Sequence, residues 1–197
     1  MKHHIKKLLR ESLISEDEDK IINLLNTGDE INIELAFGLA DGQGIDINEL
    51  VKSIYGDLLL NKADGETIKD KVLYLTNLEK LDLSYNNLTS LKGIEKLTNL
   101  KRLSLHNNNL TSLEGIENLT NLKRLDLSDN DLTNLKGIEK LTKLKALWLY
   151  NNKLTSLKGI GNLTNLEWLD LKGKMNLISD AEKERITALL PDTEIEF

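Results

Sequence analysis

The chain has 197 residues, no cysteine and a formal net charge of −6 at pH 7, with 40% hydrophobic and 29% charged residues. This composition predicts a soluble globular protein of one domain or two small ones, rather than a disordered or membrane-spanning chain. The lack of cysteine excludes disulfides, thiolate zinc sites and cysteine nucleophiles. The acidic balance argues against a nucleic-acid partner, because phosphate binding requires clustered Lys and Arg.

The N-terminal residues do not resemble a secretion signal. Lys6, Lys7, Arg10 and Glu11 interrupt the apolar run of about 7–15 residues that such a signal needs. No stretch approaches the roughly 20 apolar residues of a membrane-spanning helix. The sequence therefore predicts a cytoplasmic protein without membrane contact, and we expect no cofactor and no metal site.

Residues 1–70 are predicted to be helical. Ser15 is a candidate cap for a helix that runs to about Leu25, and Asn32–Leu39 has the composition of a second helix. Asp46 opens a capping box for a third helix, over about 47–59.

The N-terminal part is also the acidic part of the chain. Residues 1–74 carry 9 Lys and Arg against 15 Asp and Glu, whereas the remaining residues carry 17 of each. We expect residues 1–70 to cap the first turn of the structure that follows. The alternative is an acidic functional domain, an adaptor for which the rest of the chain is the scaffold.

From Leu75 a phrase recurs every 22 residues, and its second copy reads LTNLKRLSLHNNNLTSLEGIEN. Four copies follow one another without insertion or deletion, and a fifth opens at Leu163. The alternation around Leu81 and Leu83 predicts a short strand with one buried face. One copy cannot bury its own leucines, so successive copies must stack, with their strands side by side in a parallel sheet.

An asparagine follows each strand, where the chain turns inward. Its amide can donate to and accept from backbone groups of neighbouring turns that would otherwise be buried and unpaired. The repeat therefore predicts a structural asparagine ladder of Asn86, Asn108, Asn130 and Asn152.

The phrase L-x-x-L-x-L-x-x-N-x-L resembles the leucine-rich repeat family. The 22-residue length and the L-x-G-I return are similar to the repeats of bacterial internalins and of a phosphatase-1 regulatory subunit. The resemblance covers about residues 75–177 and implies an α/β fold, a right-handed solenoid with a parallel sheet on its concave face. It also implies a non-catalytic scaffold that binds another protein.

The fifth copy departs from the phrase, because Asn176 stands two places late and the last bend should bulge. After it, Ser179 can cap a helix over about 180–190 that Pro191 ends, and Glu194–Phe197 has the pattern of a strand. We therefore divide the chain into a helical region (1–70), five repeat turns (71–178) and a C-terminal cap (179–197).

The residues beside the buried leucines should point into solvent and form columns on the concave face, because side chains alternate along a strand. Both tryptophans fall there on adjacent turns, and Ala146 leaves space beside Trp168. Trp, Tyr and Arg dominate protein interfaces. The residues expected to bind a protein partner are Trp148, Tyr150, Trp168, Arg124, His106, Asp126, Arg102, Tyr85 and Lys172.

Two other interpretations remain. In the first, the aromatic residues close a homodimer, or they stack on one another and on neighbouring Asp and Lys side chains. In the second, Ser84, His106 and Ser128, which share a column, act as a catalytic group with Asp126 or Asp129. An open sheet provides no obvious pocket or oxyanion hole, so we do not expect an enzyme.

Overall fold

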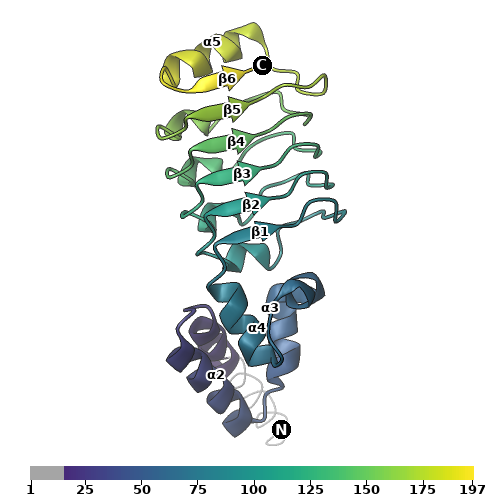
Figure 1. Cartoon of the computed structure of the whole chain (residues 1–197), viewed down its shortest axis with the longest axis vertical. Coiled ribbons are helices and arrows are strands. Elements are labelled where there is room, and N and C mark those ends of the chain that lie inside the picture. Colours follow the sequence, from purple (N-terminus) through teal and green to yellow (C-terminus); the bar gives the residue numbers. More distant parts are fainter. Residues whose placement is uncertain (1–15) are drawn as a thin grey trace, which may run out of the picture. The chain divides into compact units, whose positions relative to one another are not determined.

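The computed structural model describes residues 16–197 of the chain, which divides between Asn77 and Leu78 into two compact units (Figure 1). The first unit is helical. The second unit is a stack of short parallel strands that are joined by return segments.

The helical unit contains a helix over residues 16–25 and the helices α2 (Glu30–Gln43), α3 (Ile47–Lys62) and α4 (Ile68–Thr76). Asp46 caps α3 as predicted, and its carboxylate accepts from the backbone N–H groups of Asn48 and Glu49. The predicted cap at Ser15 lies outside the described residues. That this region caps the repeats remains a prediction.

Helix α4 was not predicted. The pair Thr67 and Asp70 forms a complete capping box, with side chain and backbone bonded in both directions. The leucine phrase obscures this helix in the sequence, because the phrase can be read as beginning at Leu75. Leu75 and Thr76 instead form the last turn of α4.

The repeat unit contains one six-stranded parallel sheet in chain order (Figure 1). Its strands are β1 (Lys80–Asp82), β2 (Arg102–Ser104), β3 (Arg124–Asp126), β4 (Ala146–Trp148), β5 (Trp168–Asp170) and β6 (Glu194–Glu196). The returns contain the 3₁₀ turns η1 (Ile94–Lys96), η2 (Ile116–Asn118), η3 (Ile138–Lys140) and η4 (Ile160–Asn162). The 22-residue period explains the register, because Leu81, Leu103 and Leu125 pair across adjacent strands.

The core of the repeat unit is built from equivalent leucines and isoleucines of successive turns. The middle leucine of each strand β1–β5 is buried between two residues that are less buried. The isoleucines that begin η1–η4 are buried from the opposite side. Each turn therefore buries its apolar side chains against its neighbours, as a solenoid requires.

Inward-facing asparagines follow the strands. The side chain of Asn108 accepts from the N–H groups of Asn86 and Leu88 in the preceding turn and donates to the carbonyls of Leu83 and Leu105. Asn130 and Asn152 repeat this arrangement in the next turns, whereas the Asn86 amide donates to Ser84 within its own turn. These bonds pair buried backbone groups that the short strands leave unpaired.

The last turn reaches the ladder despite its altered spacing. Two additional residues and a left-handed backbone at Gly173 (φ 110°) form a wider bend. The Asn176 amide then donates to the carbonyls of Leu149 and Leu171, each at 3.0 Å, and accepts from Leu154 N–H. The predicted bulge is therefore present, and it restores the asparagine to its position.

The C-terminal elements match their predicted positions. Ser179 caps α5 (Asp180–Leu189), and β6 pairs with β5 in parallel. Glu182 of α5 accepts two bonds from Arg185, at 2.7 and 2.8 Å, and one from the backbone N–H of Leu157, at 2.7 Å. This carboxylate connects the cap to the fourth repeat.

The Glu182 carboxylate also makes the stability of the fold depend on pH. Its bonds, that from Arg185 above all, lower the pKa of Glu182 from 4.5 to about 2. Since the pKa is lower in the folded state, the stabilisation is complete above about pH 4.5 and is lost as the pH falls toward about 2. We expect Glu182→Gln to lower the free energy of unfolding at pH 7 by about 1–2 kcal/mol, and the difference from wild type to shrink at pH 3.

Urea unfolding at both pH values measures this, with Glu184→Gln as the control, because Glu184 lies exposed on the same helix. A Glu182→Gln protein as stable as the control at pH 7 would contradict the stabilising role of the Glu182 carboxylate.

None of the helices within residues 16–197 has the length and apolar character that a membrane span requires.

Candidate protein-binding surface

The side chains that flank the buried leucines form what we call the open face of the sheet. Register places Lys80, Arg102, Arg124, Ala146 and Trp168 in one column across β1–β5. Asp82, Ser104, Asp126, Trp148 and Asp170 form the second column. Both columns are those that the repeat period predicts.

The aromatic residues lie at one end of this face. Trp148 and Trp168 stand on the adjacent strands β4 and β5 and are half-buried, while Tyr150 is 42% exposed. Ala146 lies between Arg124 and Trp168 in its column, and both tryptophans line a groove of about 570 Å³. The small alanine therefore leaves room beside two large rings for a side chain from another molecule.

Tyr85 and His106 form an aromatic contact between the first two turns. Their rings meet edge to face at a centroid distance of 5.1 Å, and the Tyr85 hydroxyl lies 3.0 Å from His106 Nε2. On its other side, His106 Nδ1 lies 3.4 Å from a carboxylate oxygen of Asp129. These contacts connect three successive turns at the edge of the open face.

The backbone at Tyr85 is unusual. Tyr85 has a φ of 59°, and its equivalents in the next turns, Asn107, Asp129 and Asn151, have φ values of 51° to 53°. Asn and Asp tolerate this left-handed region, whereas a bulky aromatic residue there is strained. Tyr85 thus has a strained backbone, although its side chain is 68% exposed and adds little to the core.

We therefore expect Tyr85→Asn to raise the free energy of unfolding by about 0.5–1 kcal/mol, because Asn suits the left-handed backbone. Thermal unfolding followed by circular dichroism measures the change. Tyr150→Asn is the matched control, because Tyr150 is not among the residues with positive φ. A Tyr85→Asn protein less stable than wild type would show that the contact with His106 outweighs the strain.

The serines do not join His106 as a catalytic group would require. The Ser84 hydroxyl bonds to the Ser104 hydroxyl at 2.8 Å. Ser128 is only 7% exposed, so the expectation that every residue of its column stands in solvent was wrong. Its small side chain lies in the column between the larger His106 and Tyr150, which explains its burial.

Two of the predicted binding residues have roles within the fold. The Asp126 carboxylate accepts from the backbone N–H of Ser128 at 2.9 Å and so closes the turn after β3. Lys172 pairs with Glu196 of β6 at 2.7 Å, which raises the pKa of the lysine. Both side chains border the open face but already have partners.

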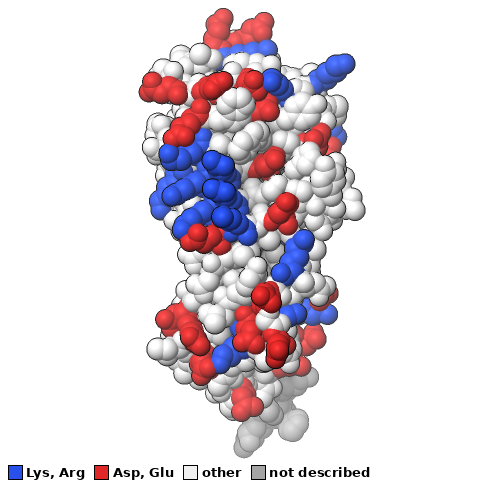
Figure 2. Space-filling view, in the orientation of Figure 1, with Lys and Arg blue, Asp and Glu red and all other residues white. Residues whose placement is uncertain are grey.

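The structure also brings together basic residues that were not predicted to form one surface. Figure 2 shows a cluster of Lys and Arg beside the start of the strands. We call it the basic band, and it consists of Lys80, Lys101, Arg102, Lys123, Arg124 and Lys145, all of which line the groove that reaches the tryptophans. The signal was present in the sequence, as adjacent basic pairs 22 residues apart, but the net charge of the chain obscured it.

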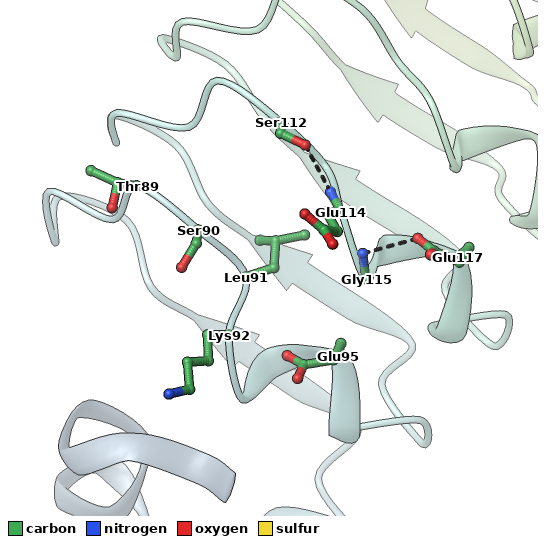
Figure 3. A pocket seen from close by; sticks show the side chains of 9 residues that line it. All are labelled: Thr89, Ser90, Leu91, Lys92, Glu95, Ser112, Glu114, Gly115 and Glu117. Atoms are coloured by element: carbon green, nitrogen blue, oxygen red, sulfur yellow. Dashed lines mark hydrogen bonds between the residues drawn. The ribbon is translucent and has the colours of Figure 1, made fainter. Parts of the chain in front are cut away.

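A second hollow lies among the return segments (Figure 3). Its volume is about 470 Å³, and Glu95, Glu114 and Glu117 are among its lining residues. Glu117 accepts from the backbone N–H of Gly115, and Ser112 accepts from that of Glu114. A similar hollow recurs one turn further on, so it belongs to the repeat geometry and is not a distinct site. Residues 16–197 contain no cluster of three His, Asp or Glu that could hold a metal ion.

Comparison with known proteins agrees with this geometry. Residues 76–118, 98–137 and 120–160 match the family model "Leucine Rich repeats (2 copies)". The repeat unit is an α/β leucine-rich repeat solenoid, and it resembles the repeats of bacterial internalins. No curated protein matches the chain significantly.

Three solved structures illustrate the likeness. Internalin C2 of Listeria monocytogenes is 28% identical with a TM-score of 0.58, and the match covers 64% of this chain and 54% of that one. An internalin of the same species (inlF) is 27% identical with a TM-score of 0.59, over 75% of this chain and 41% of that one. A leucine-rich repeat protein of Leptospira interrogans is 39% identical with a TM-score of 0.50, over 64% of this chain and 39% of that one. The chain thus spans about half or less of the length of these structures.

Proposed function

We propose that the chain is a non-catalytic module that binds a protein partner on the open face of the sheet. The observation that carries this proposal is the pair Trp148 and Trp168, which lie diagonally on the adjacent strands β4 and β5 and line one groove together with Ala146. Leucine-rich repeat solenoids generally use extended surfaces of this kind to bind other proteins.

The two indoles are large aromatic side chains on a rigid backbone. Large aromatic side chains dominate interface energetics when a partner buries them fully, and here both indoles are only half-buried. The strands beneath them are fixed by backbone bonds to neighbouring turns, such as Leu149 N–H to the Asp170 carbonyl at 2.8 Å. A partner would therefore bind a preorganised surface, at a small cost in conformational entropy.

Features that cost stability in the free chain also support the proposal. The Trp168 indole nitrogen is buried and has no acceptor among the described residues, which costs about 1–3 kcal/mol. Tyr85 occupies a strained backbone at the edge of the same face. Residues that lower stability without serving the core are expected where a surface is selected for binding.

The experiment uses the purified chain and its variants as bait. It compares which proteins each of them captures from lysate and from culture supernatant of the source cells. The variants are wild type, Trp148→Ala/Trp168→Ala, and the control Leu35→Ala/Tyr74→Ala, which removes two exposed apolar side chains of the helical unit. Circular dichroism verifies that all three fold alike. We expect a captured protein to be lost only with the tryptophan variant.

The other outcomes separate the alternatives. Loss with the Leu35→Ala/Tyr74→Ala variant alone would move the site to the helical unit, as the adaptor interpretation requires. A mass that rises with concentration in light scattering for wild type, but not for the tryptophan variant, would favour a homodimer closed by the aromatic residues.

A further inference from the structure

We infer that the basic band selects an acidic segment of the partner chain, next to an apolar side chain that enters the groove between Trp148 and Trp168. This inference rests on the proposed function and specifies the chemistry of the partner. Three features of the six basic side chains support it: their fixed positions, the ion pairs that they form or lack, and the residues that surround them.

Backbone bonds hold the band in register. Lys123 and Arg124 both donate their backbone N–H groups to the carbonyl of Lys101, at 2.8 and 3.1 Å. Lys145 and Ala146 donate in the same way to the carbonyl of Lys123, at 2.9 and 3.2 Å. The basic pairs of successive turns therefore stack at the strand spacing of about 4.8 Å, so that two parallel rows of positive charge run across the sheet.

Only the two outer lysines of the row Lys101, Lys123 and Lys145 are paired with glutamates, and the row Lys80, Arg102 and Arg124 has no such pair. Glu79 pairs with Lys101, whose hydrogen bond lowers the pKa of that carboxyl, and Glu167 pairs with Lys145. The other four basic residues form no ion pair with any carboxylate of residues 16–197. These are Lys80, Arg102, Lys123 and Arg124, and all four are exposed.

Stacking like charges on adjacent strands destabilises a sheet. Arg102 and Arg124 face each other directly in the register of β2 and β3, with Lys80 next in the column. An anionic ligand laid across the rows would relieve this repulsion. The arrangement thus favours a ligand with several negative charges about one strand spacing apart, as carboxylates along an extended peptide can provide.

The surroundings favour a peptide over a nucleic acid. Asp82, Asp126 and Asp170 occupy three of the five places in the column beside the band, and Asp82 and Asp126 line the same hollow as Arg102 and Arg124. A uniformly charged phosphate backbone crossing the face would meet these carboxylates. A peptide can place glutamates on the band alone and an apolar residue against the tryptophans.

The test uses fluorescein-labelled synthetic probes of equal length, measured by fluorescence anisotropy. The probes are a dodecapeptide of six glutamates followed by leucine and glycines, the same peptide with glutamines, and a twelve-nucleotide thymidine strand. We expect wild type to bind the glutamate peptide at least about tenfold more tightly than the glutamine peptide. Binding should weaken as salt rises, because the contacts are exposed charges.

The variant Arg102→Gln/Lys123→Gln/Arg124→Gln should lose at least about tenfold in affinity for the glutamate peptide. Its melting temperature should equal or exceed that of wild type, since charge repulsion is removed. The matched control is Lys92→Gln/Lys136→Gln/Lys158→Gln, which changes three exposed lysines of the return segments and should bind like wild type.

Three results would overturn the inference. They are equal binding of the glutamate and glutamine peptides, loss of binding in the control variant, or tighter binding of the thymidine strand. If the basic variant still captures the cellular partner and the tryptophan variant does not, the acidic segment is wrong while the proposed function stands. If neither variant affects capture, the open face itself is wrong.

Discussion

Replacing Asn130 with alanine is expected to lower the free energy of unfolding of the repeat unit by about 4 kcal/mol. The Asn130 amide donates to the carbonyls of Leu105 at 2.9 Å, Leu127 at 3.1 Å and Ser128 at 3.2 Å, and its oxygen accepts from Leu110 N–H at 3.0 Å. Alanine would leave these buried groups without their partner. Each unpaired group costs about 1–3 kcal/mol, and relaxation of neighbouring turns recovers part of the loss.

Denaturant unfolding monitored by circular dichroism measures this effect. The control is Asn118→Ala, which changes an exposed asparagine whose equivalents in the first and third copies are Lys96 and Lys140, and it should cost less than about 0.5 kcal/mol. Asn130→Asp provides a second variant of the same size. Its carboxylate would face three carbonyl oxygens, so it should be at least as destabilising as alanine. Stability close to wild type for both variants would refute the role of the ladder.

Gly173→Ala is expected to cost about 3 kcal/mol through strain in the last bend. A Cβ at this position would lie 2.5 Å from the backbone nitrogen of Asn151 and 2.8 Å from its Cα, and the φ of 110° is one that alanine rarely adopts. The same nitrogen donates to the Lys172 carbonyl at 2.9 Å, so the clash would also disturb a bond between turns. The C-terminal cap should therefore loosen first.

Hydrogen exchange of α5 and β6 detects that loosening, alongside the change in melting temperature. Gly38→Ala is the control for the same chemical change, because Gly38 lies within α2 with nothing within 4 Å of its added Cβ. It should raise stability by about 0.5–1 kcal/mol. Unchanged protection of α5 and β6 in Gly173→Ala would show that the bend tolerates a side chain.

The repeat was predictable because one periodic pattern determines strand register, buried leucines and asparagine position together. Once Leu81 pairs with Leu103, every equivalent residue in later turns is aligned, and so are the columns of the open face. The late Asn176 was also a readable departure, since a bend with two additional residues must widen to bring the amide back. Local capping residues placed α5 in the same way.

Other features depend on information that the repeat phrase does not carry. Helix α4 was hidden because its last residues, Leu75 and Thr76, also fit the leucine phrase. The basic band arises from two neighbouring columns, and Lys101, Lys123 and Lys145 precede the strands, where no side-chain direction was assigned. The half-buried state of the tryptophans and the strain at Tyr85 are consequences of packing and backbone shape.

Photo-cross-linking from the open face tests the central claim most directly. Tyr150, replaced by p-benzoylphenylalanine, places the reactive group beside the tryptophans, while the same replacement at Lys136 and at Leu35 probes the return side and the helical unit. We predict a covalent adduct with a partner protein from position 150 and none from the other two. An adduct from position 136 or 35, with none from 150, would contradict binding on the open face of the sheet.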